Sequence, residues 1–225
     1  MPSRPYAVAF DVIETMMALQ PLSARFAAVG LPEHLLATWF ARTVRDGFVF
    51  AAAGGFAPFP DVAAQALRIV SGFQVDDAQV ADVLAGMRDL PAHPDVEPAV
   101  RLLAEAGVRL ACLTNGSPSV TADFVERSGL APYFDTVISI EDTQTWKPAA
   151  GVYRHAASAL AVEPSRLALI AAHAWDCHGA HRAGLTTGWV SRLEREHSPV
   201  YDEPDVTGAD LVEVARGLLA LRPDT

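Results

Sequence analysis

The sequence is short of basic side chains, cysteine and long apolar runs. Lys and Arg total 17 against 27 Asp and Glu, a formal net charge of −10 at pH 7, so the surface suits neither nucleic acid nor an anionic membrane. The 2 cysteines, Cys112 and Cys177, are too few for a disulfide framework. No stretch approaches the roughly 18 apolar residues of a membrane span, and residues 1–10 lack a signal-peptide pattern. We therefore expect a soluble, cytoplasmic protein.

Short apolar runs alternate with helical stretches along most of the chain. The runs cover residues 6–12, 108–113, 136–140, 167–172 and 187–190, and each is typical of a parallel strand that is buried on both faces. Helical patterns fill residues 94–106, 117–128, 149–160 and 176–183, and several of them stop at a glycine. This order predicts an α/β fold with a doubly wound, Rossmann-like parallel sheet.

One long segment interrupts the alternation. Residues 16–93 contain no strand-like run of comparable quality, only amphipathic helical patterns at 35–53, 60–70 and 78–88. We therefore expect a core domain made of residues 1–15 and 94–225, with residues 16–93 inserted as a helical cap. Because ligands of open α/β sheets bind beyond the carboxyl ends of the strands, that edge is where the cap and the site should meet.

Chemically versatile side chains follow four of the predicted strands. They are Asp11 and Thr15 after the first, Thr114, Asn115 and Ser117 after the second, Lys147 after the third, and His173 and Asp176 after the fourth. A carboxylate can act as a nucleophile, and a neighbouring ammonium keeps it ionised. Hydroxyl, amide and helix N-terminal donors can hold an anion, and a second carboxylate can anchor the lysine or activate water.

Taken singly, each of these residues has an ordinary structural interpretation. An aspartate at a strand end is commonly a cap or turn residue, and Asn-Gly-Ser-Pro at residues 115–118 is a normal turn and helix start. The functional interpretation depends on their joint placement at successive strand ends.

That placement resembles the four ordered motifs of the haloacid dehalogenase superfamily. The motifs are Phe10-Asp-Val-Ile-Glu-Thr15, Leu113-Thr-Asn-Gly-Ser117, Trp146-Lys-Pro148 with Tyr153, and residues 172–180 with their Ala-Trp-Asp. Within the superfamily they are most similar to the type II L-2-haloacid dehalogenases. The resemblance implies that Asp11 displaces halide from a small 2-haloalkanoic acid and that water then hydrolyses the resulting ester.

The resemblance also implies roles for the surrounding residues. Lys147 would stabilise Asp11, Tyr153 would support the lysine loop, and Asp176 would assist the hydrolytic water. Thr15, Thr114, Asn115 and Ser117 would orient Asp11 or hold the substrate carboxylate. The aromatic residues Trp175, Phe40, Phe56 and Phe59 would form an apolar wall around the substrate. Proteins of this family are commonly homodimers.

Most relatives of this fold are magnesium-dependent phosphatases, and two features argue against that chemistry here. Their second Asp, two residues after the nucleophile, is Ile13, and residues 171–174 after the fourth strand contain no carboxylate. Mg²⁺ requires hard oxygen ligands, so we expect neither a metal nor another cofactor. A degenerate phosphatase and a catalytically silent protein that binds carboxylates remain the alternatives.

Three positions depart from the dehalogenase pattern. The halide-binding arginine that follows the tryptophan is Phe40 here, with Arg42 and Arg45 nearby, and a serine of the fourth motif is Ala171. The third is His173, which stands for an asparagine. Its imidazole can be a general base or fill the asparagine's space with a hydrogen bond to backbone. His173, Cys177, His178 and His181 also resemble a soft-metal cluster, although a helix would spread their side chains apart.

Overall fold

The protein, described here as a computed structural model of residues 2–222, is built on a parallel six-stranded sheet. The strands are β1 (Ala7–Phe10), β2 (Arg109–Thr114), β3 (Thr136–Ser139), β4 (Leu167–Ala171), β5 (Thr186–Val190) and β6 (Val206–Gly208). Their order in the sheet is β3-β2-β1-β4-β5-β6. This topology confirms the predicted doubly wound α/β fold.

Strand β1 lies at the centre of the sheet, where its neighbours bury it on both sides. Phe10 pairs with Cys112 of β2 and Ile170 of β4, so the loops that follow these three strands leave the sheet at one edge. All four residues of β1 are fully buried, as expected of a strand covered by helices on both faces.

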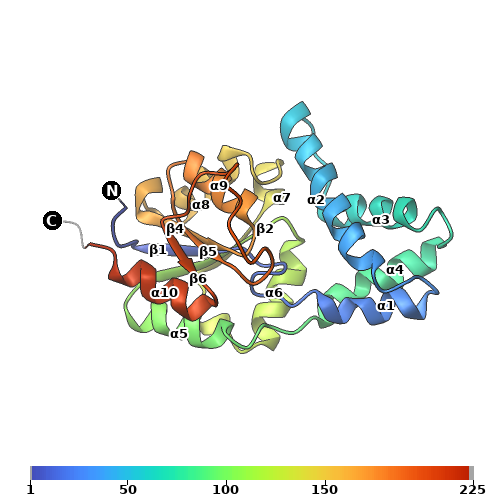
Figure 1. Ribbon diagram of the computed structural model, residues 1–225, viewed down its shortest axis with the longest axis horizontal. Helices are drawn as coiled ribbons and strands as arrows, with labels where there is room; N and C mark the ends of the chain where they lie inside the picture. Colours follow the sequence, from blue (N-terminus) through green and yellow to red (C-terminus); the bar gives the residue numbers. More distant parts are fainter. Residues whose placement is uncertain (1, 223–225) are drawn as a thin grey trace.

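Helices flank the sheet on both sides. They are α5 (Val96–Glu105), α6 (Pro118–Arg127), α7 (Ile140–Thr143), α8 (Ala150–Ala159), α9 (Ala174–Arg182) and α10 (Leu211–Ala220). Figure 1 shows α5 and α10 on one face and α8 and α9 on the other. The amphipathic pattern explains the packing of α5, because its apolar residues Val96, Val100 and Leu103 are all fully buried.

The chain between β1 and α5 is helical, as the sequence predicts. It contains α1 (Ser23–Ala28), α2 (Leu35–Ala53), α3 (Phe59–Val70), α4 (Asp77–Ala85) and a 3₁₀ turn at Gly86–Asp89. These helices gather to one side of the sheet (Figure 1). Within residues 2–222, no helix is long and apolar enough to cross a bilayer.

The structure adds elements that the sequence pattern does not reveal. Strand β6 is a 3-residue Val-Thr-Gly segment that carries no apolar run, and α10 follows it with its N-cap Asp210 accepting a hydrogen bond from the backbone N–H of Glu213.

The start of α6 lacks a side-chain cap. Ser117 occupies the N-cap position of α6, but its hydroxyl contacts Ser119 and does not cap the helix. Pro118 does stand in the first turn, as expected.

Candidate active site

Asp11, directly after β1, is a buried carboxylate with a different set of donors on each oxygen. Lys147 Nζ lies 3.0 Å from its Oδ1, and Thr15 donates its hydroxyl to Oδ2 at 2.6 Å. Burial by itself raises the pKa of Asp11, but Lys147, His173 and Thr15 outweigh it and hold that pKa well below its usual value. The carboxylate is therefore ionised at neutral pH, as a nucleophile must be.

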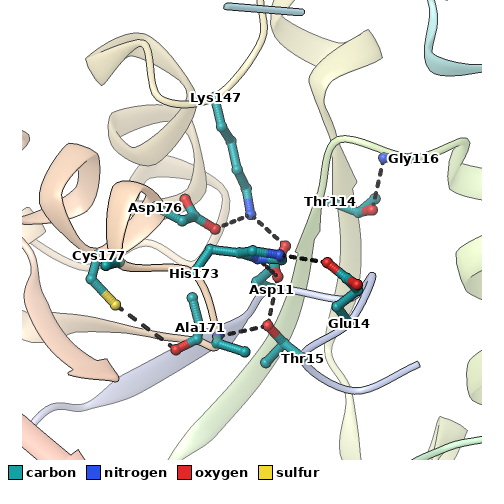
Figure 2. Close-up of polar contacts among 12 residues, drawn as sticks. Asp11, Glu14, Thr15, Thr114, Gly116, Lys147, Ala171, His173, Asp176 and Cys177 are labelled. Carbon is teal, nitrogen blue, oxygen red and sulfur yellow. Dashed lines mark hydrogen bonds and ion pairs between the residues drawn. The ribbon is translucent and has the colours of Figure 1, made fainter. Parts of the chain in front are cut away.

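Lys147 bridges two carboxylates. It is the only lysine in the sequence, its side chain is fully buried, and its Nζ lies 2.8 Å from Asp176 Oδ2 as well as 3.0 Å from Asp11 Oδ1. Burial lowers the pKa of Lys147, yet the two carboxylates raise it above the ordinary lysine value. Figure 2 shows the ammonium pointing between Asp176 and Asp11.

Asp176, in the first turn of α9, is held by a second donor. The hydroxyl of Tyr153, on α8, donates to Asp176 Oδ1 at 2.6 Å. Tyr153 is fully buried, and it supports Lys147 indirectly, because the carboxylate that it holds also contacts the lysine ammonium. Burial and the charge of Asp11 raise the pKa of Asp176 despite its contact with Lys147, which makes this carboxylate a better proton acceptor than an exposed one.

The residues after β2 fix the shape of the loop that follows this strand. Thr114 Oγ1 accepts the backbone N–H of Gly116 at 2.8 Å, and Asn115 Oδ1 accepts the backbone N–H of Lys147 at 3.1 Å. Asn115 therefore ties the loop after β2 to the lysine loop. Ser117 remains half-buried at the start of α6, where its hydroxyl contacts the hydroxyl of Ser119.

His173 makes a contact that the sequence reasoning missed. Its Nδ1 lies 3.3 Å from Asp11 Oδ2 and its Nε2 lies 3.0 Å from Glu14 Oε2, so the imidazole stands between two carboxylates (Figure 2). Burial lowers the pKa of His173, but the hydrogen bonds and charges of Asp11 and Glu14 raise it to about 10. Glu14 stands within the first motif, three residues after Asp11. This short separation in the sequence was the signal from which its contact with the site could have been predicted.

Two cavities border this group of residues. One of about 440 Å³ is lined by Glu14, Phe40, Arg45, His173 and Trp175, together with apolar residues of α2. A smaller apolar cavity of about 50 Å³ is lined by residues that include Ile13, Phe59, Gly116 and Ser117. The aromatic residues Phe40, Phe59 and Trp175 thus stand at the margins of the site, on either side of the Asp11 loop.

The two arginines of α2 differ in position. Arg45 lines the larger cavity, whereas Arg42 does not border either of the two cavities described above and its Nε lies 3.6 Å from Asp46 Oδ2. Arg45 also contacts Asp46, at 2.5 Å. The structure therefore brings Arg45, and not Arg42, to the same cavity as His173.

The soft-metal interpretation of the fourth motif is wrong for the part of the chain that the structure describes. No group of three or more His, Cys, Asp or Glu side chains there could hold a metal ion. His173 faces Asp11 and Glu14, His178 contacts Asp202 at 3.2 Å, and the Cys177 thiol points to backbone carbonyls. The two cysteines are buried and free, and burial raises the pKa of both thiols.

The donor set also does not fit the magnesium ion that phosphatases of this fold employ. Asp11 and Asp176 both contact the Lys147 ammonium, and residues 171–174 add no carboxylate. An ammonium already neutralises the two oxygens that a divalent cation would share, and octahedral Mg²⁺ requires several further oxygen ligands.

Comparisons with known proteins agree with this geometry. A family model for haloacid dehalogenase-like hydrolases matches residues 7–184. An (S)-2-haloacid dehalogenase of Xanthobacter autotrophicus is 29% identical over 84% of this chain and 76% of that protein. A solved L-2-haloacid dehalogenase superposes with a TM-score of 0.90 at 27% identity, over 97% of this chain and 100% of the other.

A further solved structure shares the fold. It is an L-2-haloacid dehalogenase from Xanthobacter autotrophicus with chloropropionic acid covalently bound, and it has a TM-score of 0.86 and 24% identity over 94% of this chain and 97% of that chain. The family model covers most of the chain, including β1 to β4 and the loops that carry the site. The chain therefore belongs to the haloacid dehalogenase-like hydrolases.

Proposed function

We propose that the protein is an (S)-2-haloacid dehalogenase that cleaves the carbon–halogen bond of small 2-haloalkanoic acids through an ester on Asp11. The observation that carries the proposal is a buried carboxylate paired with a lysine, with Ile13 in place of a general acid. Halide leaves without being protonated, so Ile13 is no handicap for this reaction. An alkoxide leaving a phosphoryl group would need that acid.

In the first half-reaction, a lone pair of Asp11 forms a bond to C2 of the substrate while the C2–halogen bond breaks. The configuration at C2 inverts and halide departs. Lys147 keeps the nucleophile ionised, and the Thr15 hydroxyl, which itself accepts the backbone N–H of Ala172 at 2.9 Å, fixes its orientation. Burial strips water from the carboxylate, which favours attack on carbon.

In the second half-reaction, water adds to Cγ of the Asp11 ester and the 2-hydroxy acid is released. Asp176 is the group suited to take a proton from that water, since its pKa is raised by burial. The neighbouring Tyr153 hydroxyl and Lys147 ammonium hold Asp176 in one orientation. His173 is fully protonated at neutral pH, which disfavours its use as the base considered from the sequence.

The start of α6 is the proposed binding site for the substrate carboxylate. Backbone N–H groups at a helix N-terminus attract anions, and Ser117 lines the small cavity beside Ile13 and Phe59. Phe40 and Trp175 form the opposite, apolar side. Arg45 is the cation best placed to substitute for the missing halide arginine, because it lines the cavity that Phe40 and Trp175 also line.

The helical segment at residues 16–93 would act as a cap that closes over these residues. It contributes Phe40 and Arg45 from α2 and Phe59 from α3 to the cavity walls. We also propose that the protein is a cytoplasmic homodimer, which the resemblance to the type II enzymes favours. Sedimentation of the purified protein tests the dimer.

The test is halide and hydroxy-acid release from chloroacetate, fluoroacetate and the two enantiomers of 2-chloropropionate. We expect stoichiometric release from an (S)-substrate, and a loss of several orders of magnitude in Asp11→Asn, as is usual when a covalent nucleophile is removed. Exposed Asp61, in the first turn of α3, gives a matched control in Asp61→Asn, which should retain activity.

A single turnover in ¹⁸O-labelled water separates this mechanism from direct hydrolysis. The label should enter Asp11 and the first product molecule should carry none, because its hydroxyl oxygen comes from the carboxylate. No halide from any substrate, or unchanged rates in Asp11→Asn, would overturn the proposal. Magnesium-dependent cleavage of a phosphate ester would favour the phosphatase alternative, and tight carboxylate binding without turnover would favour the silent one.

A further inference from the structure

Glu14 adopts a backbone conformation that a side chain normally disfavours. Its φ is 67°, in the left-handed region where glycine is the usual residue. It lies in the loop between Asp11 and Thr15, which are both active-site residues. Such strain persists where the surrounding structure enforces it and commonly marks a functional position. The Glu14 side chain keeps this strained position and contacts His173.

That side chain holds His173 against Asp11. Glu14 Oε2 is 3.0 Å from Nε2, and Asp11 Oδ2 is 3.3 Å from Nδ1. Because the imidazole faces a carboxylate at each nitrogen, both nitrogens carry protons and both donate at neutral pH. The rings of Phe40 and Trp175, with centroids 6.2 Å and 5.3 Å away, fix the plane of the imidazole.

The other charged groups around His173 do not cancel this arrangement. Lys147 contacts the far oxygen of Asp11 and is itself shared with Asp176. Arg45 lines the same cavity but contacts Asp46, and Glu194 accepts the backbone N–H of Ala174, next to His173. The two carboxylates in direct contact therefore govern the charge of the ring.

The two oxygens of Asp11 are thereby made unequal. Among contacts of the described residues, Oδ1 accepts a hydrogen bond only from Lys147, whereas Oδ2 accepts from both Thr15 and His173. A carboxylate oxygen has two in-plane lone pairs, so Oδ1 retains one for attack on carbon and Oδ2 has both engaged. Two preorganised donors on one oxygen are the usual arrangement of an oxyanion hole.

We propose that protonated His173 and Thr15 form the oxyanion hole for hydrolysis of the Asp11 ester, with Glu14 as the residue that positions His173 and keeps it charged. This inference rests on the proposed dehalogenase function. Oδ1 becomes the ester oxygen, and Oδ2 remains the carbonyl oxygen on which negative charge develops when water adds.

The electrons and protons of this step balance. The water oxygen bonds to Cγ, the carbonyl electron pair moves to Oδ2, and Asp176 takes a water proton. When the carbonyl re-forms, the Cγ–Oδ1 bond breaks and the departing oxygen takes a proton from Lys147, which recovers one from Asp176. Asp11 then ionises and its proton leaves to solvent. His173 stays protonated throughout, and it stabilises charge without transferring a proton.

The experiment compares Glu14→Gln and His173→Leu, which has no side-chain donor, with wild type in pre-steady-state assays with (S)-2-chloropropionate. We expect both variants to release about one equivalent of halide rapidly and then to form hydroxy acid slowly. The slowing should be on the order of 10²-fold when the His173 donor is removed, the loss that removal of one oxyanion donor causes elsewhere, and smaller in Glu14→Gln, which keeps the ring. The Asp11 ester should accumulate as a mass increase on the peptide that contains residue 11.

The pH dependence of ester hydrolysis supplies a readout that a purely structural role would not move. Hydrolysis by wild type should persist into alkaline solution and decline as His173 loses its proton. The declining limb should shift to lower pH in Glu14→Gln, because the carboxylate that helps to keep the ring protonated is gone. His173→Leu should lack that limb.

Two further variants complete the design. Glu14→Gly relieves the left-handed backbone, which offsets part of the stability lost with the Glu14–His173 contact, and it should still hydrolyse the ester slowly. Glu33→Gln removes a carboxylate that lines a neighbouring cavity together with Glu14, and it should behave as wild type. Unchanged hydrolysis and an unchanged pH limb in Glu14→Gln would overturn the inference alone; absence of halide release by wild type would overturn the dehalogenase proposal as well.

Discussion

At the scale of single residues, burial and charge act in opposite directions throughout the site. Burial favours the neutral forms of Asp11, Lys147 and His173, and the contacts among them restore the charged forms. Asp176 differs, since burial and the charge of Asp11 raise its pKa even beside Lys147. Neighbouring carboxylates with pKa values displaced in opposite directions suit a nucleophile and a proton acceptor.

The raised pKa of His173 predicts a dependence of stability on pH. The pKa is displaced upward, from 6.5 to about 10, so the folded state binds this proton more tightly than the unfolded state. The stabilisation is fully present below pH 6.5 and is lost as the pH rises through about 10. We expect the free energy of unfolding of wild type to decline across this interval by up to about 1.4 kcal/mol per pH unit.

Urea denaturation at a series of pH values measures this decline, and His173→Asn is the comparison. The variant should be less stable than wild type at low pH and should show a flatter profile between pH 6.5 and 10. Parallel profiles for the two proteins would contradict the assignment of the titration to His173.

At the scale of elements, helix α2 determines where the lysine loop lies. A Cβ at Gly47 would stand 2.2 Å from the ring of Trp146, so α2 packs against the residue that precedes Lys147 with no space for a side chain. Trp146 is fully buried, donates its indole N–H to Ala57 O at 2.9 Å, and stacks on Phe59 at 6.1 Å. The helical segment thus braces the residue next to Lys147.

Gly47→Ala is expected to impair both stability and activity. Overpacking a well-filled interior costs roughly 1–3 kcal/mol, which exceeds the gain of up to about 1 kcal/mol from alanine's higher helix propensity. The displaced Trp146 should move Lys147 from Asp11 and lower kcat. Thermal unfolding and halide release measure the two effects.

Gly151→Ala is the matched control. A Cβ at Gly151 would meet no atom within 4 Å, and this glycine lies in the first turn of α8. Its stability and kcat should be unchanged or slightly raised. A Gly47→Ala protein that behaves in the same way would show that α2 can shift without moving the lysine loop.

At the scale of the whole molecule, the net charge of −10 opposes the approach of an anionic substrate. Salt weakens such repulsion, since the Debye length falls from about 30 Å at about 0.01 M to about 10 Å at about 0.1 M ionic strength. We therefore expect the KM for a 2-haloalkanoate to fall as a non-halide salt is added over this range, with kcat little changed. A KM that rises with salt would mean that local cations such as Arg45 dominate substrate capture.

Much of the fold could be predicted from the sequence. The first five strands appear where apolar runs predicted them, and α2 has the predicted bounds of 35–53. Periodic patterns of this kind are strong because burial acts on every turn of a helix and every residue of a central strand. Strand β6 escaped prediction because 3 residues are too few to show a pattern.

The sequence by itself determined which residues meet at the carboxyl edge of the sheet, because Asp11, Thr114, Lys147 and Asp176 each follow an apolar run typical of a parallel strand, and such strands end at one edge. Only the tertiary structure decided which of them touch. It placed Tyr153 on Asp176, Arg45 instead of Arg42 at the cavity, and Glu14 on His173. These contacts join loops and helices that follow no repeating pattern, so their geometry is fixed by packing between elements rather than by local spacing.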